Sequence, residues 1–162
     1  MARALTFSRA LVGSDDDKYK LGETSKVEDL TNDEKRAAAL SMLEQFFSCK
    51  AMDDILEKSS KTSFAKEMGA LTLDNVFSRL WIRPGLDRRS RSLLTLGILI
   101  ALGSVEELKI HCIVALNNGL TIEELEEVIY HSTAYAGFPR TNSARLAIVE
   151  SLVREGRIAE NG

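Results

Sequence analysis

Signals that start and stop α-helices recur along this chain, whereas the alternation of apolar and polar residues typical of strands is hard to find. Three segments have the spacing of capping boxes, in which a Ser or Thr and a Glu three residues later bond each other's backbone amides: Thr31–Glu34, Ser104–Glu107 and Thr121–Glu124. Glycines stand where helices should end, at Gly103, Gly119, Gly137 and Gly156. The pattern therefore predicts an all-α fold.

The predicted organisation is a polar N-terminal arm over residues 1–30 followed by one helical domain over residues 31–162. With 162 residues and 44% hydrophobic composition, the chain is long and apolar enough for one core. We expect a compact bundle of about six to seven helices, at 32–48, 51–59, 62–80, 88–102, 105–118, 122–136 and 140–155. The last connections are short, so consecutive helices should be neighbours.

Composition excludes several classes of protein. The net charge of −3 argues against a nucleic-acid partner, because general nucleic-acid binders are usually basic. The longest apolar run, Leu93–Leu102, is too short to cross a bilayer. Cys49 and Cys112 form neither a CxxC pair nor a metal-binding spacing; they suggest a reducing compartment, with one disulfide left open. We expect a cytoplasmic protein without metal; a mitochondrial presequence over Met1–Val12 is the less favoured alternative to a frayed terminus.

The segment Glu106–Asn118 should be an unusually buried helix with His111 at its middle. Apolar residues surround it almost completely: Leu108, Ile110, Ile113, Val114, Ala115 and Leu116. Such a helix is buried on nearly all sides, which in a domain this small hints at cover from another subunit. Burial favours a neutral imidazole, which can accept or donate a proton. Position alone slightly favours the alternative of a core histidine bonded to a carbonyl.

His131 and Tyr135 lie one turn apart on the next predicted helix, so their rings could line one cavity. Glu127, one turn earlier, could orient His131; a surface Glu–His pair is the equally weighted alternative. Glu107 stands four residues before His111, but its place in the Ser104 capping box explains it without a role in chemistry. Cys112 is expected to be an inert, buried thiol.

Five arginines fall within thirteen residues, three of them where the Leu-rich helix should begin: Arg79, Arg83, Arg88, Arg89 and Arg91. Cations at a helix N-terminus oppose the helix dipole, so something should compensate them. Acids of a partner subunit or an anionic substrate could do so. A guanidinium suits a carboxylate because its donors form a planar fork, although a solvated face explains each arginine about equally well.

Three blocks of this sequence resemble the carboxymuconolactone decarboxylase family in order and spacing. They are Trp81–Leu96, Ile100–Thr121 with His111 inside it, and Glu127–Pro139 followed by Asn142. The resemblance implies an all-helical fold shared with alkylhydroperoxidase D-like proteins. It also implies homo-oligomers, hexamers or trimers, with active sites near subunit contacts.

The resemblance makes His111 the match of the family histidine and so favours a functional role for it. The peroxidase branch carries a CxxC motif at positions that here read Ser104 and Glu107, so peroxidase or disulfide-reductase chemistry is not expected. Two departures stand out. The chain matches poorly up to Lys66, and it reads Arg140-Thr-Asn-Ser143 where bacterial decarboxylases often carry Ala-Ala-Asn-His.

The expected function is cofactor-independent decarboxylation of a small carboxylated lactone such as 4-carboxymuconolactone, by general acid–base chemistry. The expected catalytic groups are His111, His131 and Tyr135, and the expected substrate-binding groups are Arg83, Arg91, Arg140 and Trp81. The first alternative is an isomerase, cyclase or dehydratase acting on a lactone, enone or polyketide-like substrate. A peroxidase or disulfide reductase is a weaker alternative, and a non-catalytic oligomeric scaffold is another.

Overall fold

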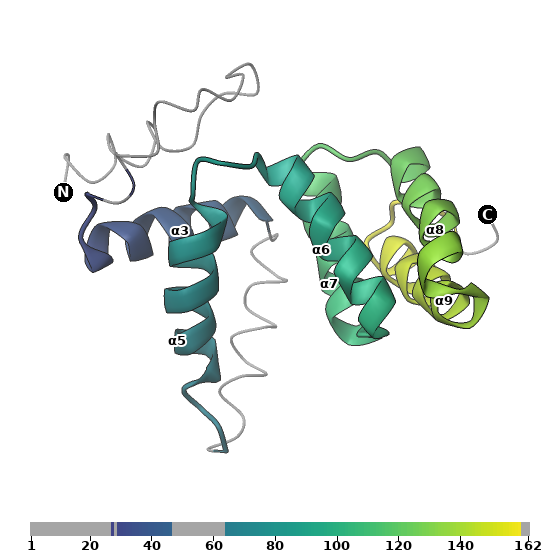
Figure 1. The fold of residues 1–162 in the computed structure, drawn as a ribbon, viewed down its shortest axis with the longest axis horizontal. Coiled ribbons are helices and arrows are strands. Elements are labelled where there is room, and N and C mark those ends of the chain that lie inside the picture. Colours follow the sequence, from purple (N-terminus) through teal and green to yellow (C-terminus); the bar gives the residue numbers. More distant parts are fainter. Residues whose placement is uncertain (1–26, 28, 47–63, 160–162) are drawn as a thin grey trace. The chain divides into compact units, whose positions relative to one another are not determined.

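The computed structural model describes residues 27, 29–46 and 64–159, and most of these residues are helical (Figure 1). They form six α-helices and one π-helical segment, and no strand occurs among them. The all-α prediction is confirmed. None of the helices described is both long enough and apolar enough to cross a membrane. The helix predicted at 51–59, Cys49 and nearly all of the predicted arm lie outside the described residues.

The helices begin and end close to their predicted positions. They are α3 (Asn32–Phe46), α5 (Met68–Thr72), the π-helix η1 (Leu73–Trp81), α6 (Arg88–Leu102), α7 (Val105–Asn117), α8 (Ile122–Ala136) and α9 (Phe138–Arg154). The main difference concerns the single helix predicted at 62–80. Within the described residues it begins only at Met68, and at Leu73 it widens from α to π geometry. An apolar period near 3.6 residues does not distinguish these two kinds of turn.

Two of the three predicted capping boxes form. Thr121 Oγ1 accepts from the Glu124 amide at 3.2 Å, and Glu124 Oε2 accepts from the Thr121 amide at 3.0 Å. The same reciprocal bonds join Thr31 and Glu34 at 3.3 and 2.9 Å. The prediction for Ser104 is wrong, because its side chain makes no cap hydrogen bond. Its φ of −81° and ψ of 73° depart from the extended conformation that a capping serine usually adopts.

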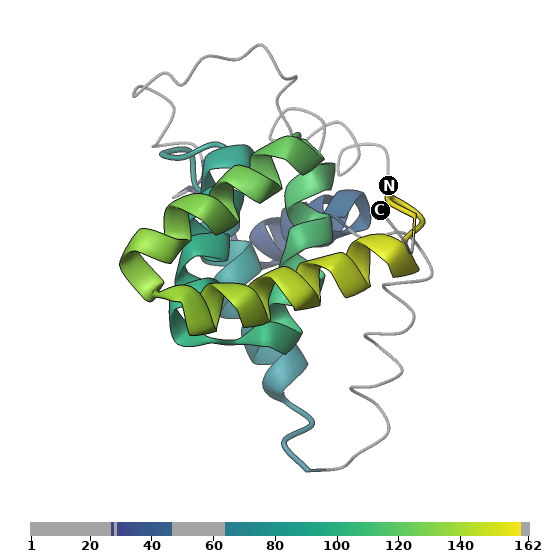
Figure 2. The ribbon, with the colours of Figure 1, turned by 90° about the vertical axis from the view of Figure 1, so that its right-hand side faces the viewer.

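The four glycines predicted to end helices all have positive φ angles: Gly103, Gly119, Gly137 and Gly156. Gly137, at φ 81°, ends α8 and immediately precedes α9. The two helices therefore meet at a sharp corner, which Figure 2 shows where the green ribbon of α8 turns into the yellow-green ribbon of α9. This is the left-handed turn that glycine adopts without steric cost.

The chain divides into two compact units, with the division between Asp87 and Arg88. In the first unit α3 packs against η1. Phe46 meets Trp81 edge to face, with ring centroids 5.1 Å apart and planes at 69°. Both side chains are buried. The aromatic pair thus joins the end of one helix to the end of the other.

The second unit contains α6, α7, α8 and α9 around one apolar core. α7 and α8 each pack on both α6 and α9. The core is formed by Leu96, Ile100, Leu108, Cys112, Ala115, Leu120, Leu125, Ile129, Ala144, Ile148 and Leu152. Each of the four helices contributes one stripe to it, as expected for short antiparallel connections.

The prediction that α7 is buried on nearly all sides holds only in part. Leu108, Cys112, Val114 and Ala115 are buried, but Ile110 is 37% exposed. Ile113 and Leu116 are half-buried. One face of α7 therefore stays open in the single chain.

Replacing Gly103 by alanine should lower the free energy of unfolding by about 1 kcal/mol, because φ of +73° is strained for any residue with a Cβ. The added Cβ would also lie 2.5 Å from Nη1 of Arg140, which would have to move. Chemical denaturation measures the difference.

Gly97→Ala is the matched control for this prediction. Gly97 lies inside α6, and a Cβ there would meet nothing within 4 Å. That change should therefore stabilise the protein by roughly 0.5–1 kcal/mol through helix propensity. Equal effects of the two substitutions would contradict the role assigned to the left-handed turn.

Candidate active site

His111 lies on α7 beside the stripe that enters the core. Its neighbours Leu108, Cys112 and Ala115 are at most 1% exposed, and the Nδ1 atom of His111 is itself buried. Burial lowers the pKa of His111 because it penalises the charged imidazolium. The negative charge of Glu107 acts in the opposite direction and raises that pKa. The resting imidazole is therefore mostly neutral near pH 7, with one carboxylate acting on its protonation.

Glu107 is a candidate residue that the sequence reasoning set aside. The assignment to a capping box was wrong, since Ser104 makes no cap bond. Glu107 stands one turn before His111, and residues four apart share a helix face. Its carboxylate is exposed and acts electrostatically on the imidazole. The four-residue spacing between Glu107 and His111 was the sequence signal for this interaction, but the capping motif offered another explanation for Glu107.

A second polar contact lies on the same side of α7. Asn118 follows His111 by seven residues, or two turns, and therefore lies on the same side of the helix. Its Nδ2 donates to Ser92 Oγ of α6 at 3.0 Å. Ser92 is 2% exposed. This bond fixes α6 against the C-terminal end of α7 on the side that carries His111.

His131 and Tyr135 share a face of α8, as their spacing predicts. The two rings stack with centroids 5.0 Å apart and planes tilted by 40°. Both residues are exposed, Tyr135 to 81%. The core face of α8 is the one that carries Leu125 and Ile129. Within this unit, therefore, the stacked pair faces outward while His111 lies on another helix beside the core.

Part of the positive charge of the arginine cluster is compensated by an acidic residue of the same chain. Arg89, in the first turn of α6, pairs with Glu124 of α8. That carboxylate also caps α8, so it faces the N-termini of two helices, where an acid is favourable. A partner subunit is thus not needed for Arg89. Arg91 is half-buried on α6, whereas Arg83 is exposed after η1 in the first unit.

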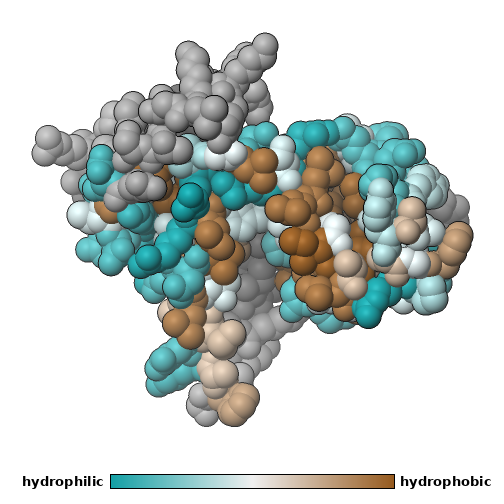
Figure 3. Space-filling view, viewed as in Figure 1, coloured by the Kyte–Doolittle hydropathy of each residue, from teal (hydrophilic) through white to brown (hydrophobic). Residues whose placement is uncertain are grey.

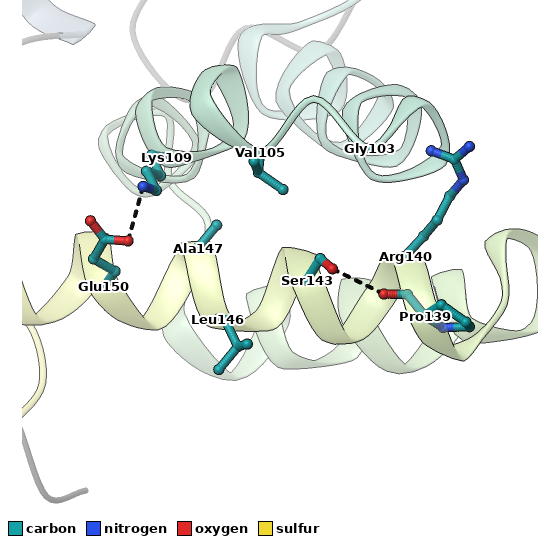
Figure 4. Close-up of a pocket in the computed structure, with 9 residues that line it drawn as sticks. All are labelled: Gly103, Val105, Lys109, Pro139, Arg140, Ser143, Leu146, Ala147 and Glu150. Atoms are coloured by element: carbon teal, nitrogen blue, oxygen red, sulfur yellow. Dashed lines mark hydrogen bonds and ion pairs between the residues drawn. The ribbon is translucent and has the colours of Figure 1, made fainter.

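A pocket of about 620 Å³ opens between the start of α7 and α9 (Figure 4). It is lined by Gly103, Val105, Lys109, Pro139, Arg140, Ser143, Leu146, Ala147 and Glu150. Figure 4 shows the Arg140 side chain reaching from α9 toward Gly103, and Ser143 Oγ donates to the Pro139 carbonyl at 3.1 Å. The pocket rim therefore contains Arg140 and Ser143, two of the three positions at which the chain departs from Ala-Ala-Asn-His.

Lys109 closes the far end of this pocket through two ion pairs. Its Nζ lies 2.9 Å from Glu150 and 3.1 Å from Glu106. Hydrogen bonds to Glu150 and then to Glu106 raise the pKa of Lys109, so its ammonium stays charged. Lys109 and His111 are two residues apart and so lie on opposite sides of α7. The structure therefore places Arg140 and His111 on different sides of this helix.

Trp81 and Cys112 both occupy core positions. Trp81 is 8% exposed and packs on Phe46. Cys112 is fully buried, which raises the pKa of its thiol to about 11, and the thiol donates to the Lys109 carbonyl at 3.3 Å. A thiol with so high a pKa is a poor nucleophile, as predicted.

Comparison with known proteins decides the family. Residues 66–150, more than half of the chain, match the model of the carboxymuconolactone decarboxylase family. The chain belongs to the carboxymuconolactone decarboxylase family. It is 47% identical over 68 residues to the 4-carboxymuconolactone decarboxylase of Acinetobacter baylyi, covering 42% of this chain and 51% of the relative. It is 36% identical over 91 residues to the nitrosuccinic acid decarboxylase of Metarhizium robertsii, covering 56% of this chain and 64% of the relative.

A third relative is an uncharacterized 15.0 kDa protein of Paracoccus denitrificans, 33% identical over 85 residues, or 51% of this chain and 63% of that protein. The chain thus spans between about half and just under two thirds of the length of these relatives. All seven site residues predicted from the sequence fall inside the family match, as does Glu107.

Glu107→Gln should lower the pKa of His111 further, because it removes the negative charge that favours the imidazolium while burial remains. An NMR titration of the imidazole Hε1 resonance measures the change.

Glu106→Gln is the matched control, because Glu106 pairs with Lys109 on another side of α7. It should shift the pKa of His111 much less. A pKa that rises in Glu107→Gln, or that moves equally in both variants, would contradict the electrostatic effect of Glu107 on His111.

Proposed function

We propose that this protein is a cofactor-independent decarboxylase of a small carboxylated molecule such as 4-carboxymuconolactone, with His111 as the proton donor. The observation that carries the proposal is the family match, which includes a histidine at the edge of a buried core with a carboxylate one turn away. Two relatives named as decarboxylases, acting on different acids, support the reaction type.

The two named substrates suggest which acids suit this scaffold. Carboxymuconolactone carries an unsaturated lactone, and nitrosuccinic acid carries a nitro group. Either group can accept the electron pair released when the carbon–carbon bond to carbon dioxide breaks. A substrate with its own electron acceptor requires less of the protein. The protein then has to bind the carboxylates, stabilise the developing anion and deliver one proton to carbon.

In the proposed mechanism Arg91 binds a carboxylate of the substrate that His111 protonates, because a guanidinium forms charge-assisted, often bidentate bonds to carboxylates. Arg83 and Arg140 are assigned the same role. Arg140 lies on the other side of α7 from His111 and would therefore act on this substrate from another copy of the chain.

Trp81 is also assigned to substrate binding. Because it packs on Phe46, it would act by supporting the loop that follows η1. Tyr135 is assigned to stabilising the negative charge that develops on the substrate.

The proton comes from the imidazolium form of His111, which is the minor form near pH 7 because burial lowers its pKa and which takes up its proton from solvent between turnovers. Glu107 stabilises that form, while burial lets it give the proton up readily. The carbon–carbon bond breaks, carbon dioxide leaves, the electron pair enters the lactone carbonyl, and the proton then moves from His111 to carbon. His131 and Tyr135 are assigned to stabilising the oxyanion or to acting as the second acid–base group. Because they face outward within their own unit, they would do so from another copy of the chain.

An isomerase, cyclase or dehydratase of the same acid–base type is the second candidate. The pocket rim favours keeping it, since Arg140 and Ser143 stand where bacterial decarboxylases often carry Ala and His. Such a change of size and charge would admit a different substrate while leaving His111 in place. The cytoplasmic location expected from the sequence remains a prediction alongside this choice.

Release of carbon dioxide from 4-carboxymuconolactone and from nitrosuccinate, in parallel assays, tests the proposal. His111→Ala should lower turnover by about 100-fold, the contribution of a positioned proton donor. Glu126→Gln, an exposed change on α8, is the control for handling and folding.

Turnover that survives in His111→Ala would remove that residue from the mechanism. If the wild-type protein folds but releases no carbon dioxide from either acid, the isomerase or dehydratase proposal would take precedence.

We also infer that two or more copies of the chain assemble and that the outer face of α6 contacts another copy. Leu94, Ile98 and Leu102 recur every four residues and are 58%, 49% and 65% exposed. They belong to the apolar area over α6 that is brown in Figure 3. Exposed stripes of this kind are typical of interaction sites. Assembly would also bring new neighbours to outward-facing groups such as Tyr135.

Ile98→Lys should shift the assembly toward monomer, because it puts a charge into the apolar contact. Light scattering coupled to size-exclusion chromatography measures the mass. Leu146→Lys on α9, where Leu146 is 53% exposed, is the control and should leave the mass unchanged. A wild-type chain that is monomeric at micromolar concentration would overturn this inference.

A further inference from the structure

A second cavity lies in the first unit, between the start of α3 and the π-helix η1. Its volume is about 230 Å³. It is lined by Asn32, Asp33, Lys35, Arg36, Asp74, Ser78 and Arg79. All of these residues are polar, and none of them is among the residues assigned to decarboxylation. Their concentration around a small cavity calls for a physical explanation.

The π geometry of η1 brings three of these residues to one face. In a π-helix the backbone bonds run between residues five apart, so Asp74 and Arg79 are one turn from each other and Ser78 lies beside them. In an α-helix Asp74 and Arg79 would point in directions about 140° apart. π-turns are rare and recur at functional sites. The π geometry of η1, which the apolar pattern of the sequence did not predict, therefore forms one side of this cavity.

Ser78 places a buried hydroxyl group at this cavity. It is 3% exposed, and its Oγ has no hydrogen-bond partner in the part of the chain that the structure describes. A buried hydroxyl without a partner is costly and uncommon. Because Ser78 lines the cavity, a molecule placed there could accept its hydrogen bond.

The charge of the lining favours an anion. Three cationic side chains, Lys35, Arg36 and Arg79, face two carboxylates, Asp33 and Asp74, so the lining carries one excess positive charge. Arg36 Nη1 lies 2.6 Å from Asp74 Oδ1 and holds α3 to η1. With Asp74 paired in this way, the remaining guanidinium, that of Arg79, is a suitable donor for an oxyanion.

We propose that the cavity between α3 and η1 binds a small oxyanion, through the Ser78 hydroxyl and the Arg79 guanidinium. The volume suits inorganic phosphate or a short carboxylic acid. The shared chemistry is a compact group of negatively charged oxygens that accept from a hydroxyl and a planar fork. None of the residues assigned to decarboxylation lines this cavity, and the proposal does not depend on that reaction.

The full-length protein is titrated with inorganic phosphate and, in a second arm, with succinate, while amide resonances are followed by two-dimensional NMR. We expect saturable shifts confined to residues 32–36 and 74–79 in at least one arm. The arm with the lower dissociation constant identifies phosphate or carboxylate as the preferred source of the oxyanion.

Three variants test the assignment. Arg79→Gln should weaken binding by about tenfold or more, because it removes a charge-assisted contact. Ser78→Ala should weaken it several-fold, and it should not lower the melting temperature of the free protein, since it removes a buried hydroxyl that lacks a partner. Arg145→Gln, an exposed change on α9, is the matched control and should leave affinity unchanged.

Shifts spread over many surface cations would overturn the proposal, as would the absence of saturable shifts in both arms. Affinity that is unchanged in both Arg79→Gln and Ser78→Ala would also overturn it. Since the readout is binding and not turnover, an inactive enzyme would leave this test intact.

Discussion

The burial of one narrow stripe of α7 is the constraint on which the arrangement of the second unit depends. Leu108, Cys112 and Ala115 are at most 1% exposed and enter the core shared with α6, α8 and α9. Once this stripe is fixed, helical geometry leaves no choice for its neighbours. His111 lies to one side of the stripe and Lys109 to the other. The packing of this apolar stripe therefore places His111 and the charged pocket at Lys109 on different sides of α7.

Two charged side chains in this unit, one acidic and one basic, each bind two partners. Glu124 caps α8 and pairs with Arg89 of α6, and Lys109 bridges Glu106 on its own helix and Glu150 on α9. Partly exposed ion pairs contribute little to stability individually. Their effect here is on orientation, since each joins the start of one helix to a neighbour. The polar bond between Ser92 and Asn118 does the same at the other end of α7.

The proposed function requires a substrate that supplies its own electron acceptor. The relatives named as decarboxylases act on two different acids, so the family fold is compatible with more than one substrate. In this chain the histidine of α7 lies within the family match, whereas the rim of the 620 Å³ pocket carries Arg140 and Ser143. Under the proposed function, substrate choice would vary with the residues at this rim, while His111 would keep its proposed role as proton donor.

Helix positions could be predicted from the sequence because their signals are local. A capping box at Thr121 and a glycine at Gly137 act within one or two turns, and both were predicted correctly. The misassigned cap at Ser104 illustrates the limit. The motif permits a cap bond, but the backbone angles that allow the bond are set by how α6 turns into α7. Glu107 is subject to the same limit. The capping motif accounted for this residue in the sequence, but the cap does not form, and the charge of Glu107 acts on His111 instead.

Contacts between residues far apart in the chain were decided by tertiary structure alone. The partner of Arg89 is an acid 35 residues away, and the Arg36–Asp74 pair spans 38 residues. The sequence determined which side chains could carry charge or donate a proton, and the stripes on which they lie. Within the described part of the chain, it did not determine the switch of η1 to π geometry, the lack of a hydrogen-bond partner for the Ser78 hydroxyl or the cavities beside η1 and α7. The physical reason is that these features depend on how the faces of different helices pack, whereas the sequence pattern reports only the faces themselves.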